Sequence, residues 1–259
     1  MSSELHTERR GSTLVLTVSD PASRNSLSEQ VYAAGIEALG VAESDSTVRA
    51  IVLRGDGAHF SAGANLSRLK QNREASPEIQ GETLQAFHDF VEALRVTPKP
   101  VIAAVEGAAA GGGFSLALAC DLVVAAADAR IALSDGRIGL SPDGGITWQL
   151  MQRLPRGVVL QWIWLGEPVP VPELHALGLV NWVTDSGQAF AKALEIADRL
   201  AACAPNALAS AKDLVNQWPQ RTLAEQAALE RTQFLDNLFH PNSAEGLAAF
   251  AAKRPPAFE

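Results

Sequence analysis

Cysteine is scarce in this chain, with only Cys120 and Cys203 among 259 residues. Neither has metal-ligand spacing, so we expect no metal site, and both lie in apolar stretches typical of reduced core residues. Charged residues make up 19% of the chain and the formal net charge is −8. Because an acidic chain repels phosphate backbones, we expect no nucleic-acid partner.

The sequence also lacks a long uninterrupted apolar run. Its most apolar region, Val101 to Cys120, is broken by Glu106 and by a glycine run, which argues against a membrane span. Met1 to Arg10 is polar and has no apolar segment of the kind found in signal peptides. We therefore expect a cytoplasmic protein that does not bind membranes. The hydrophobic content of 47% suffices for a sizeable core.

Strand-like and helix-like segments alternate along most of the chain. The alternating segment Thr13 to Val18 and the apolar runs Ala50 to Leu53 and Val101 to Val105 predict strands. Ser26 and Glu29 have the spacing of a capping box, which predicts the start of an amphipathic helix. Repetition of strand, turn and helix predicts an α/β fold.

From about residue 190 the signals are mainly helical. We expect a core with the active site over residues 1–195 and a helical region for oligomerisation over residues 196–259.

Two loops share one design, because each follows a predicted buried strand, contains small residues and leads into a predicted helix. They are Phe60 to Leu66 (FSAGANL) and Ala110 to Ser115 (AGGGFS). A helix N-terminus leaves free N–H groups, and two such groups aimed at one point would form an oxyanion hole. For either loop alone, tight packing of a strand against a helix is the favoured explanation. The chain has neither a phosphate-loop lysine nor a spaced dinucleotide fingerprint, so a nucleotide cofactor is not expected.

At these residues the chain resembles the enoyl-CoA hydratase/isomerase family, also called the crotonase family. The matching motifs cover nearly the whole chain: FSAGANL (60–66), PVIAAVEGAAAGGG (100–113), ALACDLV (117–123), PDGG (142–145), ALGLV (176–180) and FAAKRPPAF (250–258). The resemblance implies a spiral of ββα turns with a C-terminal helical trimerisation region, assembled as a homotrimer or a dimer of trimers. It also implies an acyl-CoA substrate, with coenzyme A as part of that substrate and no separate cofactor.

The resemblance assigns roles to particular residues. The backbone N–H groups of Ala64 and Gly112 would form an oxyanion hole that stabilises an enolate of the thioester. Phe250 and Lys253 match positions that often reach coenzyme A from an adjacent subunit. The positions expected to bind coenzyme A are Ser23, Arg24, Ala62, Asn65, Leu66, Phe250 and Lys253.

The acid–base residues differ from those of hydratases in the family, which use two glutamates to activate water. Ser115 and Asp135 occupy these two positions, so the two-glutamate mechanism is in doubt. Asp143 matches the acidic position of isomerases such as 1,2-epoxyphenylacetyl-CoA isomerase, and an apolar pocket would raise its pKa. Asp143 also fits a purely structural role, as the N-cap of the helix after Gly145.

His88 is a third candidate, after Asp143 and Asp135. Its helical spacing from Leu84, Phe87 and Val91 predicts a position on the apolar face, where a histidine usually has a structural role. His88 also matches a catalytic histidine of the aroyl-CoA dehalogenase branch, in which an Asp at position 143 is the nucleophile.

The favoured reaction is isomerisation or hydration of an enoyl-CoA in fatty-acid or aromatic-compound metabolism. The alternatives are an acyl-CoA hydrolase or aroyl-CoA dehalogenase that uses Asp143 and His88, and a non-catalytic CoA-binding protein.

Overall fold

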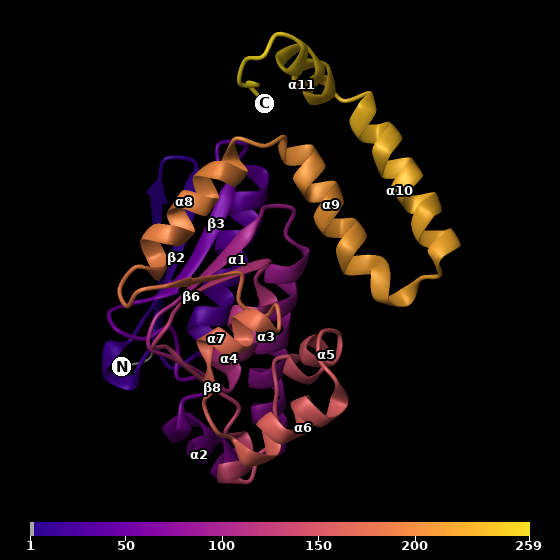
Figure 1. Ribbon diagram of the computed structural model, residues 1–259. Helices are drawn as coiled ribbons and strands as arrows, with labels where there is room; N and C mark the ends of the chain where they lie inside the picture. Colours follow the sequence, from indigo (N-terminus) through magenta and orange to yellow (C-terminus); the bar gives the residue numbers. More distant parts are fainter. Residues whose placement is uncertain (1–2) are drawn as a thin grey trace.

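The computed structural model describes residues 3–259, whose strands form two sheets (Figure 1). The larger sheet has the order β1-β2-β3-β4-β6-β9, and the smaller sheet has the order β5-β7-β8. The strands are β1 (Glu4–Arg10), β2 (Thr13–Ser19), β3 (Ala50–Gly55), β4 (Val101–Val105), β5 (Ala108–Ala110), β6 (Leu122–Ala126), β7 (Arg130–Ala132), β8 (Val169–Pro170) and β9 (Trp182–Thr184).

The larger sheet is parallel except for β1, which pairs antiparallel with β2. Strand β4 is buried along its whole length, as expected for an apolar run in a parallel sheet covered on both faces. The chain alternates between the two sheets. After β4 in the larger sheet comes β5 in the smaller one, and after β6 in the larger sheet comes β7 in the smaller one.

Helices cover both faces of the larger sheet, and the C-terminal ones continue beyond it. They are α1 (Glu29–Ser44), α2 (Leu66–Ala75), α3 (Pro77–Val96), α4 (Gly112–Ala119), α5 (Ile146–Met151), α6 (Arg156–Leu165), α7 (Val171–Ala176), α8 (Ala189–Ala201), α9 (Pro205–Gln217), α10 (Leu223–Leu238) and α11 (Pro241–Ala251), with short 3₁₀ turns at Pro21–Ser23, Asp135–Ile138 and Trp218–Gln220.

Alternation along β3 decides which helices meet which face. Ile51 and Leu53 join the main core with residues of α1, α3 and α4. Ala50 and Val52 face the other way and pack against the small side chains of α8. The strands therefore carry apolar residues on both faces, and their carboxyl ends point towards the loops that form the site.

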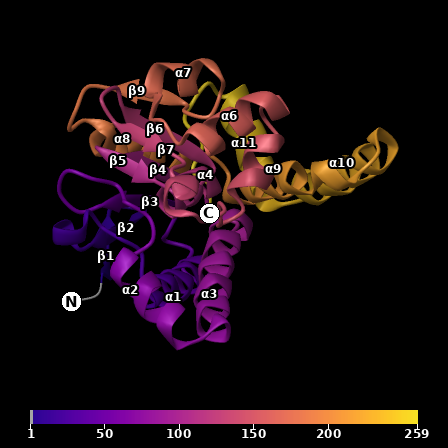
Figure 2. The same ribbon diagram turned by 90° about the horizontal axis from the view of Figure 1, so that it is seen from below.

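Helices α9 to α11 extend away from the sheets (Figures 1 and 2). Lys212 of α9 ties them to the core, because its Nζ lies 2.8 Å from the carboxylate of Asp121, which also accepts a hydrogen bond from the N–H of Val101. The expected boundary at residues 195/196 lies inside α8, a helix that packs on the larger sheet.

Two local predictions from the sequence are wrong, and one strand was missed. The N-cap of α1 is Ser28, whose hydroxyl accepts the N–H of Val31, whereas the hydroxyl of Ser26 donates to Ser23. Strand β1 precedes the first predicted strand and was not anticipated, since its side chains are mostly exposed and give no apolar signal. Cys203 is exposed, while Cys120 is buried as expected.

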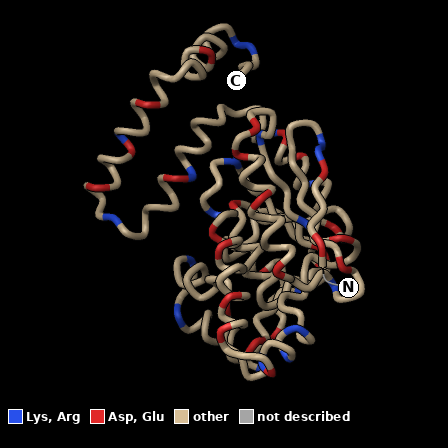
Figure 3. Tube along the Cα trace, turned by 180° about the vertical axis from the view of Figure 1, so that it is seen from behind, with Lys and Arg blue, Asp and Glu red and all other residues tan. Residues whose placement is uncertain are grey.

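Acidic and basic side chains are interspersed over the molecule (Figure 3). Over residues 3–259, the helices are all too short or too polar to cross a membrane.

Candidate active site

The two small-residue loops lie side by side at the carboxyl ends of β3 and β4. Hydrogen bonds join them directly: the N–H of Ser61 donates to the carbonyl of Ala108 at 2.9 Å, and the N–H of Ala110 donates to the carbonyl of Ser61 at 3.0 Å. Because β3 and β4 are parallel neighbours, residues that follow them in the sequence meet at the same edge of the sheet.

Glycine is needed where the loops touch. A Cβ at Gly63 would lie 2.4 Å from the carbonyl oxygen of Ala110 and 3.1 Å from the nitrogen of Gly112, and Gly63 has φ +81°. A Cβ at Gly113 would lie 2.4 Å from the carbonyl oxygen of Ser61. Only residues without a side chain allow this backbone contact.

The contact brings the N–H groups of Ala64 and Gly112 to the same cleft. Gly112 is the first residue of α4, whose N-terminus carries partial positive charge. Among residues 3–259, neither N–H donates to a protein acceptor. The site therefore offers two unused donors at one place, which is the requirement for binding a developing oxyanion.

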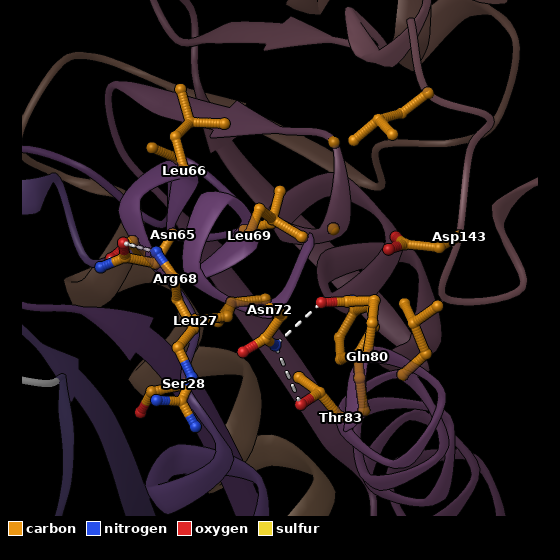
Figure 4. Close-up of a pocket in the computed structure, with 18 of the residues that line it drawn as sticks. Leu27, Ser28, Asn65, Leu66, Arg68, Leu69, Asn72, Gln80, Thr83 and Asp143 are labelled. Carbon is orange, nitrogen blue, oxygen red and sulfur yellow. Dashed lines mark hydrogen bonds between the residues drawn. The ribbon is translucent and has the colours of Figure 1, made fainter. Parts of the chain in front are cut away.

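The cleft has a volume of about 910 Å³ and contains residues from α1, α2, α3 and both loops (Figure 4). Of the residues singled out in the sequence, those that line it are Ser23, Ala62, Ala64, Asn65, Leu66, Gly112, Asp135 and Asp143.

Asp143 points its carboxylate into this cleft (Figure 4). Burial raises the pKa of its carboxyl, the negative charge of Asp135 raises that pKa further, and His88 partly opposes the shift. The N-cap of α5 is Gly145, with no side-chain capping bond, so the N-cap role considered for Asp143 is wrong. A carboxyl with a raised pKa at an apolar cleft is suited to accepting and returning a proton.

Ser115 holds the turn that carries Asp143. Its side chain is fully buried, and its hydroxyl donates to the backbone carbonyl of Asp143 at 3.0 Å. A Cβ at Gly144 would lie 2.7 Å from the Cβ of Ser115, so the turn packs directly on this serine. The turn fills space that a longer carboxylic side chain at position 115 would need.

Asp135 lies beside the second oxyanion loop, in the 3₁₀ turn after β7. A Cβ at Gly111 would be 3.2 Å from its Oδ1. Its Oδ2 is buried without a hydrogen-bond partner in the part of the chain that the structure describes. Burial raises the pKa of this carboxyl. The negative charge of Asp135 also raises the pKa of Asp143, so the two carboxyls lie close enough at the cleft for one to affect the other.

His88 does not occupy the expected position. It is exposed rather than on the apolar face of α3, which is formed by Phe87, Phe90, Val91 and Leu94. Its Nε2 accepts the N–H of Gly144 at 3.4 Å, so it contacts the backbone of the Asp143 turn and is not part of the cleft lining.

Three residues expected at the coenzyme A site lie outside the cleft lining of one chain. Arg24 has a left-handed backbone, and its carbonyl accepts the N–H of Ala62, so it anchors the first loop. Phe250 of α11 is 87% exposed, and Lys253 follows that helix. Figure 1 shows α11 at the opposite end of the molecule from α2, a helix that contributes to the cleft.

Several residues of α1, α2 and α3 that line the cleft were not predicted from the sequence. Tyr32, the only tyrosine, is buried on α1 with its ring 5.2 Å from that of Phe87. Asn72 of α2 donates to Gln80 of α3 at 2.9 Å and lies 3.5 Å from the hydroxyl of Thr83 (Figure 4). Helical periodicity marks Tyr32 as a core position, but no local pattern predicts that α1, α2 and α3 meet around one cavity.

The comparisons with known proteins agree along the chain. A family model described as enoyl-CoA hydratase/isomerase matches residues 8–259. The 2,3-dehydroadipyl-CoA hydratase of Escherichia coli (strain K12) is 32% identical over 99% of each chain. The 1,2-epoxyphenylacetyl-CoA isomerase of the same organism is 32% identical over 95% of this chain and 94% of its own.

A solved structure agrees in fold as well as in sequence. The crystal structure of an enoyl-CoA hydratase from Polaromonas sp. JS666 is 49% identical, with a TM-score of 0.98 over 99% of this chain and 100% of the other. The fold expected from the sequence is thereby confirmed. This chain is an enzyme of the enoyl-CoA hydratase/isomerase (crotonase) family.

Proposed function

We propose that the enzyme isomerises an acyl-CoA thioester, with Asp143 as the group that moves the proton. The observation that supports this choice is that the turn carrying Asp143 packs on Ser115, and that Asp143 lines the same cleft as the two residues with unused N–H donors. A two-glutamate hydration mechanism needs a second carboxylate at position 115, and this chain has a serine there.

The proposed chemistry uses the oxyanion hole first. The thioester oxygen accepts hydrogen bonds from the N–H groups of Ala64 and Gly112, which lowers the energy of the enolate. With a 3-enoyl-CoA, Asp143 removes a proton from the α carbon, the double bond shifts, and the same carboxyl returns the proton to the γ carbon. The raised pKa of Asp143 suits both halves of this transfer. Asp135 acts by keeping that pKa raised.

We propose that coenzyme A binds against Ser23, Ala62, Asn65 and Leu66, which line the cleft. We further propose that neighbouring subunits of a homotrimer or a dimer of trimers complete the site with Phe250 and Lys253. Large apolar side chains exposed on α9 to α11 and their connections support such an assembly: Val215, Trp218, Leu223, Phe234, Phe239, Leu247 and Phe250.

The test is turnover of 2-enoyl-, 3-enoyl- and 1,2-epoxyphenylacetyl-CoA by the wild type and by Asp143→Asn. We expect isomerised products from the wild type, no oxygen from ¹⁸O-labelled water in them, and a 10²–10⁴-fold lower kcat in the variant, roughly the contribution of one general acid–base. Net hydration of the 2-enoyl substrate, or equal activity of the two proteins, would contradict the proposal.

A further inference from the structure

Negatively charged side chains outnumber positively charged ones in the lining of the cleft. Within the described residues, its lining includes three carboxylates, from Glu29, Asp135 and Asp143, and one cation, Arg68. The Nη2 of Arg68 lies 3.4 Å from Oε2 of Glu29, so the cation already has a partner.

Glu29 is held in place at the start of α1. Its Oε1 accepts a hydrogen bond from the hydroxyl of Thr83, and it is the first residue of the helix. Thr83 belongs to the polar network that joins α2 to α3 through the buried side chain of Asn72 (Figure 4). The negative charge is therefore fixed on a rigid part of the wall.

Tyr32 lines the cleft together with Glu29 and with Asp143, the proposed acid–base residue. It is one helical turn after Glu29, lines the cleft, and is only 5% exposed. Burial and the charges of Asp143 and then Glu29 raise the pKa of the Tyr32 phenol. An acyl group that extends from the thioester past Asp143 thus enters a cleft whose lining also includes the ring of Tyr32 and the carboxylate of Glu29.

We propose that the acyl site selects uncharged acyl groups and rejects those that carry a second carboxylate. This inference rests on the proposed function, since it concerns the acyl part of the same thioester. A second carboxylate would meet either Glu29 or the two partly buried aspartates, Asp135 and Asp143, and like charges a few ångströms apart repel. It would also have to compete with Glu29 for Arg68.

The test compares two substrates of equal length, 3-hexenoyl-CoA and the mono-CoA thioester of 3-hexenedioic acid. We expect the wild type to favour the uncharged substrate by about 100-fold in kcat/KM, as a few ångströms between like charges at an effective dielectric of about 20 implies. Glu29→Gln keeps an oxygen for Thr83, removes one negative charge and frees Arg68. It should lower the preference at least about tenfold.

Glu82→Gln is the matched control, because it makes the same charge change on α3 at an exposed residue outside the cleft lining, and it should leave the preference unchanged. Equal use of the two substrates by the wild type, or the same preference in Glu29→Gln and Glu82→Gln, overturns the inference. If the wild type turns over neither substrate, the proposed function fails, and the affinities of the two thioesters measured by calorimetry still decide the charge selectivity.

Discussion

Replacing Gly63 with alanine should damage the enzyme at the contact between its two loops. The new Cβ would lie 2.4 Å from the carbonyl oxygen of Ala110, which is backbone and has little freedom to move. Left-handed backbone at φ +81° costs about 1–2 kcal/mol for a residue with a side chain. Crowding adds about 1–3 kcal/mol. Separation of the loops should also displace one oxyanion donor, with a loss of about 10²–10³ in kcat.

Gly178→Ala is the matched control for this prediction. Gly178 has φ +75°, and a Cβ there meets nothing within 4 Å, so this variant pays the backbone cost without the crowding. Urea unfolding and kcat with 3-hexenoyl-CoA should be measured for both variants. We expect Gly178→Ala to be less stable than wild type and to keep its kcat. Equal stability and equal kcat in the two variants would refute the argument that the loop contact positions the donors.

Further predictions concern the carboxylates and the tie to the C-terminal helices. Asp135→Asn removes a charge that raises the pKa of Asp143, so the acid limb of the kcat/KM profile should move to lower pH; an unmoved limb contradicts the coupling. Ser115→Ala should cost about 1 kcal/mol in urea unfolding and reduce kcat severalfold, while Ser115→Glu, crowded by the Asp143 turn, should not gain hydration of 2-enoyl-CoA. Lys212→Met leaves the carboxylate of Asp121 unpaired and should cost about 1–3 kcal/mol, less than the loss of a fully buried pair. Burial raises the pKa of Asp121, so the native state holds its proton more tightly than the unfolded chain. The charge of Lys212 opposes this rise, so its removal should raise the pKa of Asp121 further. The loss of stability in Lys212→Met should therefore grow as pH rises and the Asp121 carboxyl ionises. A loss of stability that does not depend on pH would contradict this reasoning.

The sequence predicts those parts of the fold that depend on local pattern. Buried runs such as Val101 to Val105 become central strands, and the small-residue loops after β3 and β4 meet because parallel strands end at one edge. The pair of loops and the family motifs together also locate Ala64, Gly112 and Asp143 at one cleft.

Other features depend on tertiary contacts that local pattern does not contain. The apolar spacing around His88 predicts a buried position, but the buried face of α3 is centred on its neighbour Phe87 and leaves His88 exposed. The hydrogen-bond partner of His88, the N–H of Gly144, lies 56 residues away in the sequence. Ser28 rather than Ser26 caps α1 because the helix begins at Glu29, two residues later than the capping-box spacing predicts. Within the apolar helix α6, Trp162 is buried but Trp164 is 73% exposed, a difference that depends on which side of the helix meets the core.

Binding of the thioester oxygen by two main-chain donors is the claim on which the remaining chemistry depends. A crystal structure with an unreactive acyl-CoA analogue tests it directly. The nitrogens of Ala64 and Gly112 should both lie about 2.7–3.1 Å from that oxygen, with the Asp143 carboxylate beside the α carbon. An oxygen bound to other groups, or within reach of only one of the two nitrogens, would contradict the account.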